Sequence, residues 1–216
     1  MGLTRIEKIV FILILLSVVL LSVISKDKPI VLIAALCSIT YTILAGKGKI
    51  LCFFSGITGS FLYSYLSFVN SLFGSFILYA FYYIPIQIIG IFNWRKHLNK
   101  KTDSIIKTKL TKKQRLFYFS LAFILSVIVS FILQKTGDIT PYKDGFVGVF
   151  SVLGQYLTLK RCIEQWYVWF FVNLLSVFIW LKVFLLTGSG LTVVFMWLVY
   201  FLLSIYFLYS WKKELN

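Results

Sequence analysis

Long apolar runs dominate this sequence and limit what it can fold into. A helix needs about 20 mostly apolar residues to cross the hydrocarbon core of a bilayer, with about 17 as the practical minimum. Eight runs reach or approach that length: Ile9–Ser25, Pro29–Ala45, Ile50–Val69, Leu72–Trp94, Leu116–Gln134, Gly145–Leu159, Trp166–Leu186 and Leu191–Trp211. We therefore predict an all-α, polytopic membrane protein with eight spans, the sixth of them short.

The composition excludes several other classes of protein. Charged residues make up only 13% of the 216 positions, whereas a soluble domain carries about 25%. The longest polar stretch, Arg95–Arg115, is predicted to be a connecting loop, which leaves no room for a soluble domain. Three cysteines without paired spacing favour neither a disulfide framework nor a zinc site, and the lone His97 is interpreted as a solvated side chain. The net charge of +15 does not predict a nucleic-acid partner, because the basic residues lie between the apolar runs.

The basic residues set the expected orientation, because cytoplasmic loops of membrane proteins carry an excess of Lys and Arg. With the N-terminus inside, only Lys26, Lys28, Lys135 and Lys143 of the 22 Lys and Arg residues fall in external segments. We predict a multi-pass protein of the inner, or plasma, membrane with both termini in the cytoplasm. The first run is either a retained span or a cleaved signal peptide; either way, the next span begins outside.

Two stretches of the chain match in layout. Ser38–Lys47 aligns with Ser151–Lys160, and each is followed by two further spans. The last span of each set ends near a tryptophan, Trp94 or Trp211, and a tyrosine precedes each tryptophan by eleven residues. The alternative is that any two apolar triplets look alike. We predict an extra N-terminal helix (1–28), a three-helix repeat (29–98), a basic loop with a connecting helix (99–143) and a second three-helix repeat (144–216). Such parallel repeats place a substrate site at their interface.

Acidic residues are absent from the middle of every predicted span. All seven lie in loops or at helix ends: Glu7, Asp27, Asp103, Asp138, Asp144, Glu164 and Glu214. Ion-coupled carriers usually keep a carboxylate inside the bundle. Its absence predicts uncoupled transport, and it argues against an enzyme or a metal site within the membrane.

Uncharged polar and aromatic side chains do occur at membrane depth. The fourth span carries a stripe of Tyr83, Gln87, Gly90 and Trp94 with a break at Pro85; the seventh carries Trp166, Trp169, Asn173, Ser176 and Trp180; the sixth adds Gln155. Indole rings near span ends are also typical of the lipid interface, and buried amides also hold helices together. As a binding surface, aromatic faces with neutral amides suit a flat heterocycle bearing a hydroxylated sugar, and a cationic pyridinium would gain cation–π attraction.

At these positions the sequence resembles the bacterial nicotinamide riboside transporter (PnuC-type) family. The resemblance covers about residues 30 to 215. It depends on Gln155-Tyr156 before Lys160-Arg161, on Trp166-x-x-Trp169-x-x-x-Asn173, and on Gly90-x-x-Asn93-Trp94. The chain departs from the family by having Ile91 after Gly90, and only Gly56 and Ser60 lie opposite Trp169 and Asn173 in the repeat alignment.

The resemblance implies a 3+1+3 helical bundle like that of SWEET-type sugar facilitators, assembled as homotrimers without a cofactor. It implies import of nicotinamide riboside by facilitated diffusion, with trapping by phosphorylation in the cytoplasm. Trp169 and Trp166 would pack against the nicotinamide ring, and Asn173, Gln155 and Gln87 would bond its amide and ribose. Together with the stripe on the fourth span, the candidate binding residues are Trp169, Asn173, Gln155, Trp166, Gln87, Tyr83, Trp94 and Asn93. Thiamine, riboflavin and deoxynucleosides are alternative cargoes, and a non-transporting membrane scaffold is the alternative class.

Overall fold

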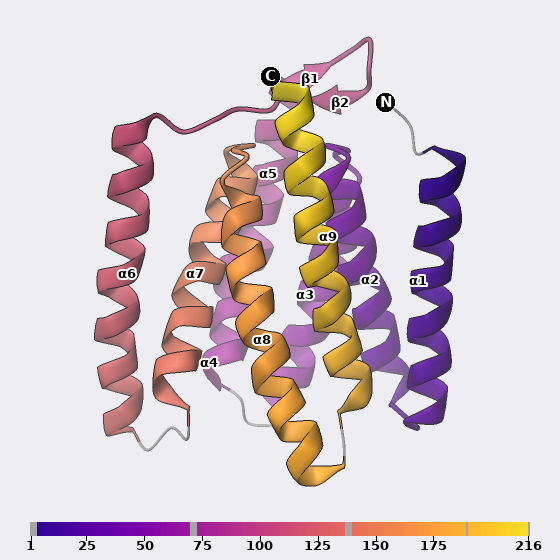
Figure 1. Ribbon diagram of the computed structural model, residues 1–216, viewed down its shortest axis with the longest axis vertical. Helices are drawn as coiled ribbons and strands as arrows, with labels where there is room; N and C mark the ends of the chain where they lie inside the picture. Colours follow the sequence, from indigo (N-terminus) through magenta and orange to yellow (C-terminus); the bar gives the residue numbers. More distant parts are fainter. Residues whose placement is uncertain (1–3, 70–72, 137–139, 189, 216) are drawn as a thin grey trace.

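The helices follow the predicted apolar runs. The computed structural model describes residues 4–69, 73–136, 140–188 and 190–215, most of which are helical (Figure 1). In order, the elements are α1 (Arg5–Ile24), α2 (Pro29–Gly46), α3 (Cys52–Val69), α4 (Phe73–Ile77), the π-helix η1 (Leu78–Tyr83), α5 (Ile84–Lys96), β1 (Leu98–Asn99), β2 (Ser104–Ile105), α6 (Lys112–Lys135), α7 (Pro141–Leu159), α8 (Gln165–Thr187) and α9 (Leu191–Leu215). The predicted positions Leu72 and Asp138 lie outside the described residues.

Two helices begin about one turn before the apolar run that predicted them. The cause is the same in both, a capping box in which a threonine and a residue three positions later satisfy each other's backbone N–H groups. Thr4 and Glu7 form this box at the start of α1, and Thr111 and Gln114 form it at the start of α6. The polar first turn of each helix is therefore fixed by side-chain caps and not by hydrophobicity.

The fourth predicted span is not one regular helix. A short α-helix leads into the π-helix η1, and α5 then begins with Pro85 in its first turn. Proline lacks the N–H that would continue the ladder of α-helical hydrogen bonds, and wider π turns are one way in which a helix absorbs such a break. The interruption expected at Pro85 is present, and the π-helix brings Tyr79, Tyr82 and Tyr83 close together.

Seven segments of the described chain are long and apolar enough to cross a membrane. Helix α7 is absent from that set although it has 19 residues, because Lys143 and Asp144 lie in its first turn. It nevertheless runs alongside the others in the bundle (Figure 1). The sixth span was predicted to be short, and in the structure this polar turn completes its length.

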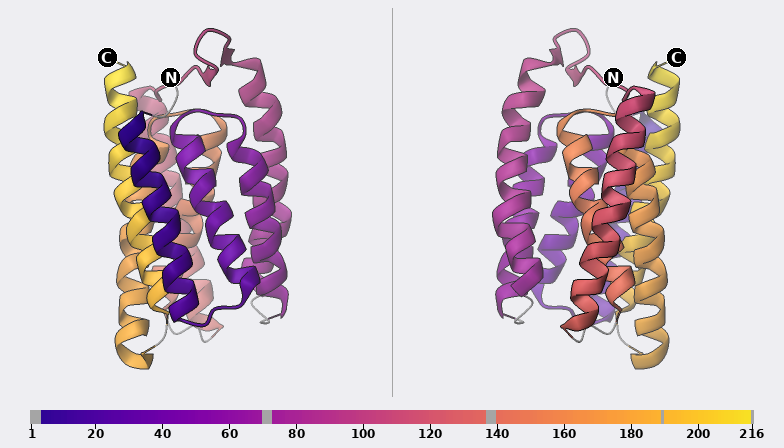
Figure 2. Two further views of the ribbon diagram at one scale, coloured as in Figure 1. Left: turned by 90° about the vertical axis from the view of Figure 1, so that its right-hand side faces the viewer. Right: turned by 90° about the vertical axis from the view of Figure 1, so that its left-hand side faces the viewer.

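Six segments form a closed ring through their neighbouring contacts. The ring runs from α2 to α3, α5, α7, α8, α9 and back to α2. Helix α1 packs outside the ring on α2 and α9, and α6 packs outside it on α7. The side views in Figure 2 show α1 and α6 on opposite outer faces of the bundle. Large apolar side chains cover the outer surface, as a lipid-facing bundle requires.

Two tryptophans bridge the two halves of the ring. Trp94, at the end of α5, donates its indole N–H to the Thr158 carbonyl of α7 over 3.0 Å. Trp211, at the end of α9, donates to the Gly46 carbonyl of α2 over 2.7 Å. Both indoles are fully buried, so their interpretation as lipid-interface residues is wrong. Each ring instead closes one half of the bundle onto the other.

We expect loss of either bridge to destabilise the protein by about 1–2 kcal/mol. Trp94→Phe and Trp211→Phe each retain an aromatic ring but remove the N–H donor, which leaves a buried carbonyl without its hydrogen bond. Thermal unfolding in detergent measures the effect, with Trp197→Phe as the control because Trp197 is only partly buried and forms no bridge of this kind. Wild-type stability in both bridge variants would contradict this role.

The basic connector between α5 and α6, residues 97–111, is an ordered segment that we call the strap. Its hairpin pairs Leu98–Asn99 with Ser104–Ile105. The sequence predicted only a connecting loop here. The strap then bonds to the turns that follow α2 and α7: the Ile105 N–H donates to the Gly48 carbonyl over 3.0 Å, and Thr108 pairs with Cys162. It lies at the end of the bundle where α1 begins and α9 ends (Figure 1).

A lysine near the middle of the strap ties it to the last helix. The Lys107 ammonium lies 2.5 Å from a Glu214 carboxylate oxygen and 4.8 Å from the centre of the Trp211 ring. Burial lowers the pKa of Lys107, and the neighbouring Glu214 partly opposes that effect. The strap therefore contacts both halves of the bundle and the end of α9.

Candidate functional site

Three predicted binding residues are turned into the bundle and not toward lipid. Gln87 is 3% exposed, Gln155 is 4% exposed and Asn173 is 5% exposed. They come from α5, α7 and α8, which are consecutive members of the ring. Neutral amides buried at membrane depth are costly unless they are hydrogen-bonded, so their inward direction has to be explained by partners or by a ligand.

Two of these amides form hydrogen bonds with neighbouring helices. The Tyr41 hydroxyl of α2 donates to the side-chain oxygen of Gln155 over 3.1 Å. The Gln87 amide nitrogen donates to the Ser60 hydroxyl of α3 over 2.8 Å. The first bond joins the two halves of the ring, and the second lies within the first half. A polar ligand that enters here would exchange these bonds for bonds of its own.

A glycine leaves room for the Gln87 side chain and the Tyr41 ring to pack together. A methyl group at Gly56 of α3 would lie 2.0 Å from the Gln87 side-chain oxygen and 2.6 Å from the Tyr41 ring. That Gln87 oxygen is buried without a hydrogen-bond partner among the described residues. It is an acceptor in the interior that a ligand N–H or O–H is able to use.

The Trp169 indole packs against the last turns of α7, the part of that helix that carries Gln155. Its indole N–H lies 3.4 Å from the Thr158 hydroxyl, and its ring covers Gly154, where an added methyl group would lie 3.0 Å away. The Thr158 hydroxyl itself donates to the Gly154 carbonyl over 2.9 Å. The half-buried Trp169 therefore rests on α7, one turn of α8 from the buried Asn173.

The other predicted binding residues have different surroundings. Trp94 donates its indole N–H to the Thr158 backbone carbonyl and packs edge-on against Phe53, with ring centroids 4.8 Å apart. Trp166 packs against Phe207 and Trp211 of α9, at centroid distances of 5.1 and 5.7 Å. The structure thus places Trp94 and Trp166 in packing contacts with Phe53, Phe207 and Trp211.

Asn93 and Tyr83 complete the predicted set. Asn93 carries a buried side-chain oxygen without a partner in the described chain. Tyr83 lies at the end of η1, where its ring packs edge-on against Tyr79 at 5.1 Å. Both stay predictions as binding residues, because neither hydrogen-bonds to the central amides.

Two residues of the site were not among the predicted ones. Tyr41 and Thr158 connect the amides and the indole, yet a tyrosine and a threonine in apolar runs carry no individual signal. For Tyr41 the repeat alignment contained a signal, because it pairs Tyr41 with Gly154, the neighbour of Gln155. For Thr158, the hydroxyl bonds back to its own helix and the indole contact comes from another helix, so only tertiary structure reveals it.

Charge is nearly absent from this interior. Every acidic residue in the described chain lies in a loop or within about one turn of a helix end. Two surface cavities of the described chain lie elsewhere: one near the strap, and one on the outer face of α6. The interior site is therefore a set of buried neutral amides, hydroxyls and one indole, which suits a ligand with hydrogen-bonding groups and a flat ring.

Substitution of Gly56 tests how closely the amides are packed. We expect Gly56→Ala to weaken ligand binding about tenfold, because the new methyl group displaces the Gln87 side chain and the Tyr41 ring. Isothermal titration measures the change. Gly148→Ala is the matched control, since a methyl group there meets nothing within 4 Å. Equal affinity in both variants would mean that the Gln87–Tyr41 contact has no part in binding.

The chain is similar to known proteins over most of its length. A family profile described as nicotinamide mononucleotide transporter matches residues 28–213. This chain belongs to that family. The nicotinamide riboside transporter PnuC of Neisseria mucosa is 29% identical in an alignment of 196 residues that covers 88% of this chain and 74% of the relative. The PnuC of Haemophilus influenzae is 27% identical over 191 residues, covering 88% and 81% of the two chains.

A solved structure of a family member has the same fold. The crystal structure of the vitamin B3 transporter PnuC superimposes with a TM-score of 0.84 at 28% identity, over 98% of this chain and 92% of that one. The resemblance seen in the sequence is confirmed. Like its relatives in the nicotinamide mononucleotide transporter family, the chain is a multi-pass membrane transporter and not an enzyme.

Proposed function

We propose that this chain imports nicotinamide riboside by facilitated diffusion. The observation that carries the proposal is the interior site, in which Gln87, Gln155 and Asn173 are buried and the Trp169 indole lies against Gly154 and Thr158 of α7. Neutral amides are able to bond the carboxamide and ribose hydroxyls of this substrate. The Trp169 ring offers its face to the cationic pyridinium, an attraction of about 2 kcal/mol in a desolvated site.

The absence of charge favours the riboside over the mononucleotide after which the family is described. A phosphate dianion inside the bundle would require cationic partners, because unpaired charge is very costly in a low-dielectric interior. The described residues around Gly56, Gln155 and Trp169 include no lysine or arginine. Entry of the neutral-sugar form, followed by phosphorylation in the cytoplasm, makes uptake one-way because the charged product no longer fits the site.

The positions of the acidic residues also support transport without ion coupling. Coupling to protons or sodium ions needs a titrating or coordinating side chain at depth, and the described helices carry their acidic residues only near their ends. We further propose two parallel three-helix repeats around the site, both termini in the cytoplasm, and assembly into trimers. The reciprocal Trp94 and Trp211 bridges support the repeat, because these two aligned tryptophans each donate to a backbone carbonyl in the last turn of a helix of the other half.

A binding panel tests the cargo. The purified protein is titrated with nicotinamide riboside, nicotinamide mononucleotide, thiamine, riboflavin and a deoxynucleoside. We expect nicotinamide riboside to bind most tightly and the mononucleotide to bind at least 100-fold more weakly. Tighter binding of thiamine, riboflavin or the deoxynucleoside would replace the proposed cargo, and equal binding of the mononucleotide would refute the charge argument.

A further inference from the structure

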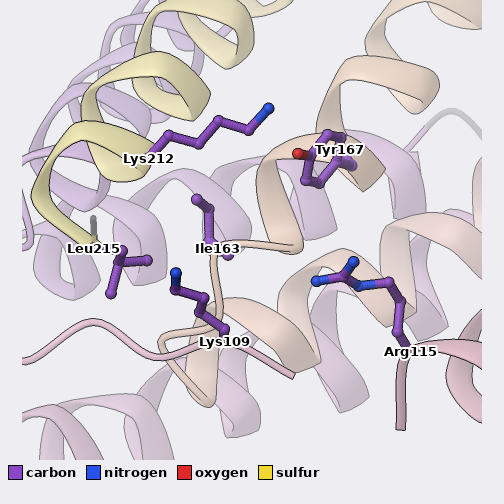
Figure 3. A pocket seen from close by; sticks show the side chains of 6 residues that line it. All are labelled: Lys109, Arg115, Ile163, Tyr167, Lys212 and Leu215. Atoms are coloured by element: carbon purple, nitrogen blue, oxygen red, sulfur yellow. The ribbon is translucent and has the colours of Figure 1, made fainter. Parts of the chain in front are cut away.

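A second concave site lies at the strap end of the molecule. A cavity of about 370 Å³ is lined by Lys109 of the strap, Arg115 of α6, Ile163 and Tyr167 at the start of α8, and Lys212 and Leu215 of α9. Figure 3 shows the three cationic side chains around one opening, each from a different part of the chain. The transport site does not use any of these residues.

Two of the three cations carry uncompensated charge. Arg115 donates to the buried Glu164 carboxylate over 2.6 Å, and the nearby Glu214 pairs with Lys107. Within the described part of the chain, no carboxylate forms an ion pair with Lys109 or Lys212. Two ammonium groups therefore face one cavity without an ion-paired carboxylate among the described residues.

The backbone that carries Lys109 is held in place. On one side, the Thr108 N–H donates to the Arg161 carbonyl, and the Ile163 N–H donates to the Thr108 carbonyl, both over 2.9 Å. On the other side, the Leu110 N–H donates to a Glu164 carboxylate oxygen over 3.1 Å. Only the side chain of Lys109 has to be ordered when a ligand binds, which reduces the entropy cost of binding.

The remaining lining gives the cavity two chemical faces. Lys212 lies 5.2 Å from the centre of the Tyr167 ring, a cation–π contact that holds its ammonium at the rim. The exposed Tyr167 adds a hydroxyl donor, whereas Ile163 and Leu215 are apolar. Ammonium and hydroxyl donors beside an apolar floor fit an anionic phosphoryl group that is attached to an uncharged organic part.

We propose that this cavity binds a phosphoryl group, through Lys109 and Lys212 with help from Arg115 and Tyr167. Two sources share that chemistry: the headgroup of an anionic phospholipid, and a soluble phosphate ester. Basic pockets between helices near the membrane surface are typical of headgroup sites. Occupancy connects the strap to α8 and α9, so the bound anion stabilises the strap end of the bundle.

Thermal unfolding in mixed micelles tests this site, with two separate arms. In the first arm the micelles contain phosphatidylglycerol or phosphatidylcholine. In the second, inorganic phosphate or glycerol 3-phosphate is compared with chloride at equal ionic strength. We expect one arm to raise the unfolding temperature by about 5 °C near saturation, and the arm that does so identifies the source.

Substitutions decide whether the effect belongs to this cavity. The double variant Lys109→Gln with Lys212→Gln should lose the anion-dependent shift, and Lys109→Arg with Lys212→Arg should keep it. Lys100→Gln with Lys101→Gln, at the exposed tip of the hairpin, is the charge-matched control and should also keep it. No shift in either arm of the wild type, or an equal loss in the hairpin control, would overturn the proposal. The readout is stability, so a failure here is independent of the transport assay.

Discussion

Trp169→Ala should weaken nicotinamide riboside binding by roughly 100-fold. Removal of an indole that stacks on a base costs about 1–3 kcal/mol, and loss of the cation–π attraction adds to it. The position is suitable because the ring lies beside Thr158 and Gly154 without being locked into the fully buried core. Isothermal titration of the purified variant measures the effect directly.

Two further variants separate binding from folding. Trp169→Phe keeps a ring and should lose only about tenfold, because phenylalanine is a weaker cation–π partner. Trp180→Ala removes an indole of the same helix three turns away, beside Gly190, and should bind like the wild type. An unchanged dissociation constant for Trp169→Ala would show that this indole is structural only.

Arg115→Ala should destabilise the protein by about 2–3 kcal/mol, lowering the unfolding temperature by roughly 5–10 °C. Its partner Glu164 is completely buried and accepts a hydrogen bond of 2.6 Å from the guanidinium. Without Arg115, a buried carboxylate keeps only the Leu110 N–H as a partner. The expected loss is below the full cost of an unpaired buried charge because half of the Arg115 side chain is exposed.

A double-mutant cycle isolates the ion pair. Glu164→Gln in the Arg115→Ala background removes the uncompensated charge and should recover more than half of the lost stability. The control is Arg95→Ala, an exposed arginine at the end of α5. All measurements use chloride buffers, so that the phosphoryl site does not contribute. A thermal unfolding midpoint for Arg115→Ala within about 1 °C of that of the wild type would contradict the role of this ion pair.

The sequence was sufficient to predict the membrane elements because hydropathy has a long, regular signal. The predicted span beginning at Pro29 matches the start of α2, whereas α7 begins at Pro141, four residues before the predicted Gly145; proline is favoured in a first helical turn. The π-helix at Leu78–Tyr83 had no such signal, as its width depends on how the chain accommodates Pro85 within the bundle. The hairpin in the strap was missed because its pairs are short and its polar residues resemble an ordinary loop.

The candidate site was predicted in part. Gln87, Gln155 and Asn173 were recognised because a neutral amide in an apolar run is unusual, and all three are buried. The role of Trp94 was ambiguous in the sequence, because a tryptophan at a helix end fits a binding stripe, a lipid interface and a bridge between halves equally well. Only the hydrogen bond to the Thr158 carbonyl distinguishes these interpretations, and it joins residues far apart in the sequence.

Uptake into proteoliposomes tests the central claim, that a charge-free interior carries nicotinamide riboside without ion coupling. Vesicles are prepared with identical buffer on both sides, and entry of labelled substrate is followed with wild-type protein, Trp169→Ala and empty vesicles. The account predicts saturable entry to equal internal and external concentrations, unchanged by ionophores and largely lost in Trp169→Ala. Accumulation that requires a proton or sodium gradient, or no entry above that of empty vesicles, would contradict it.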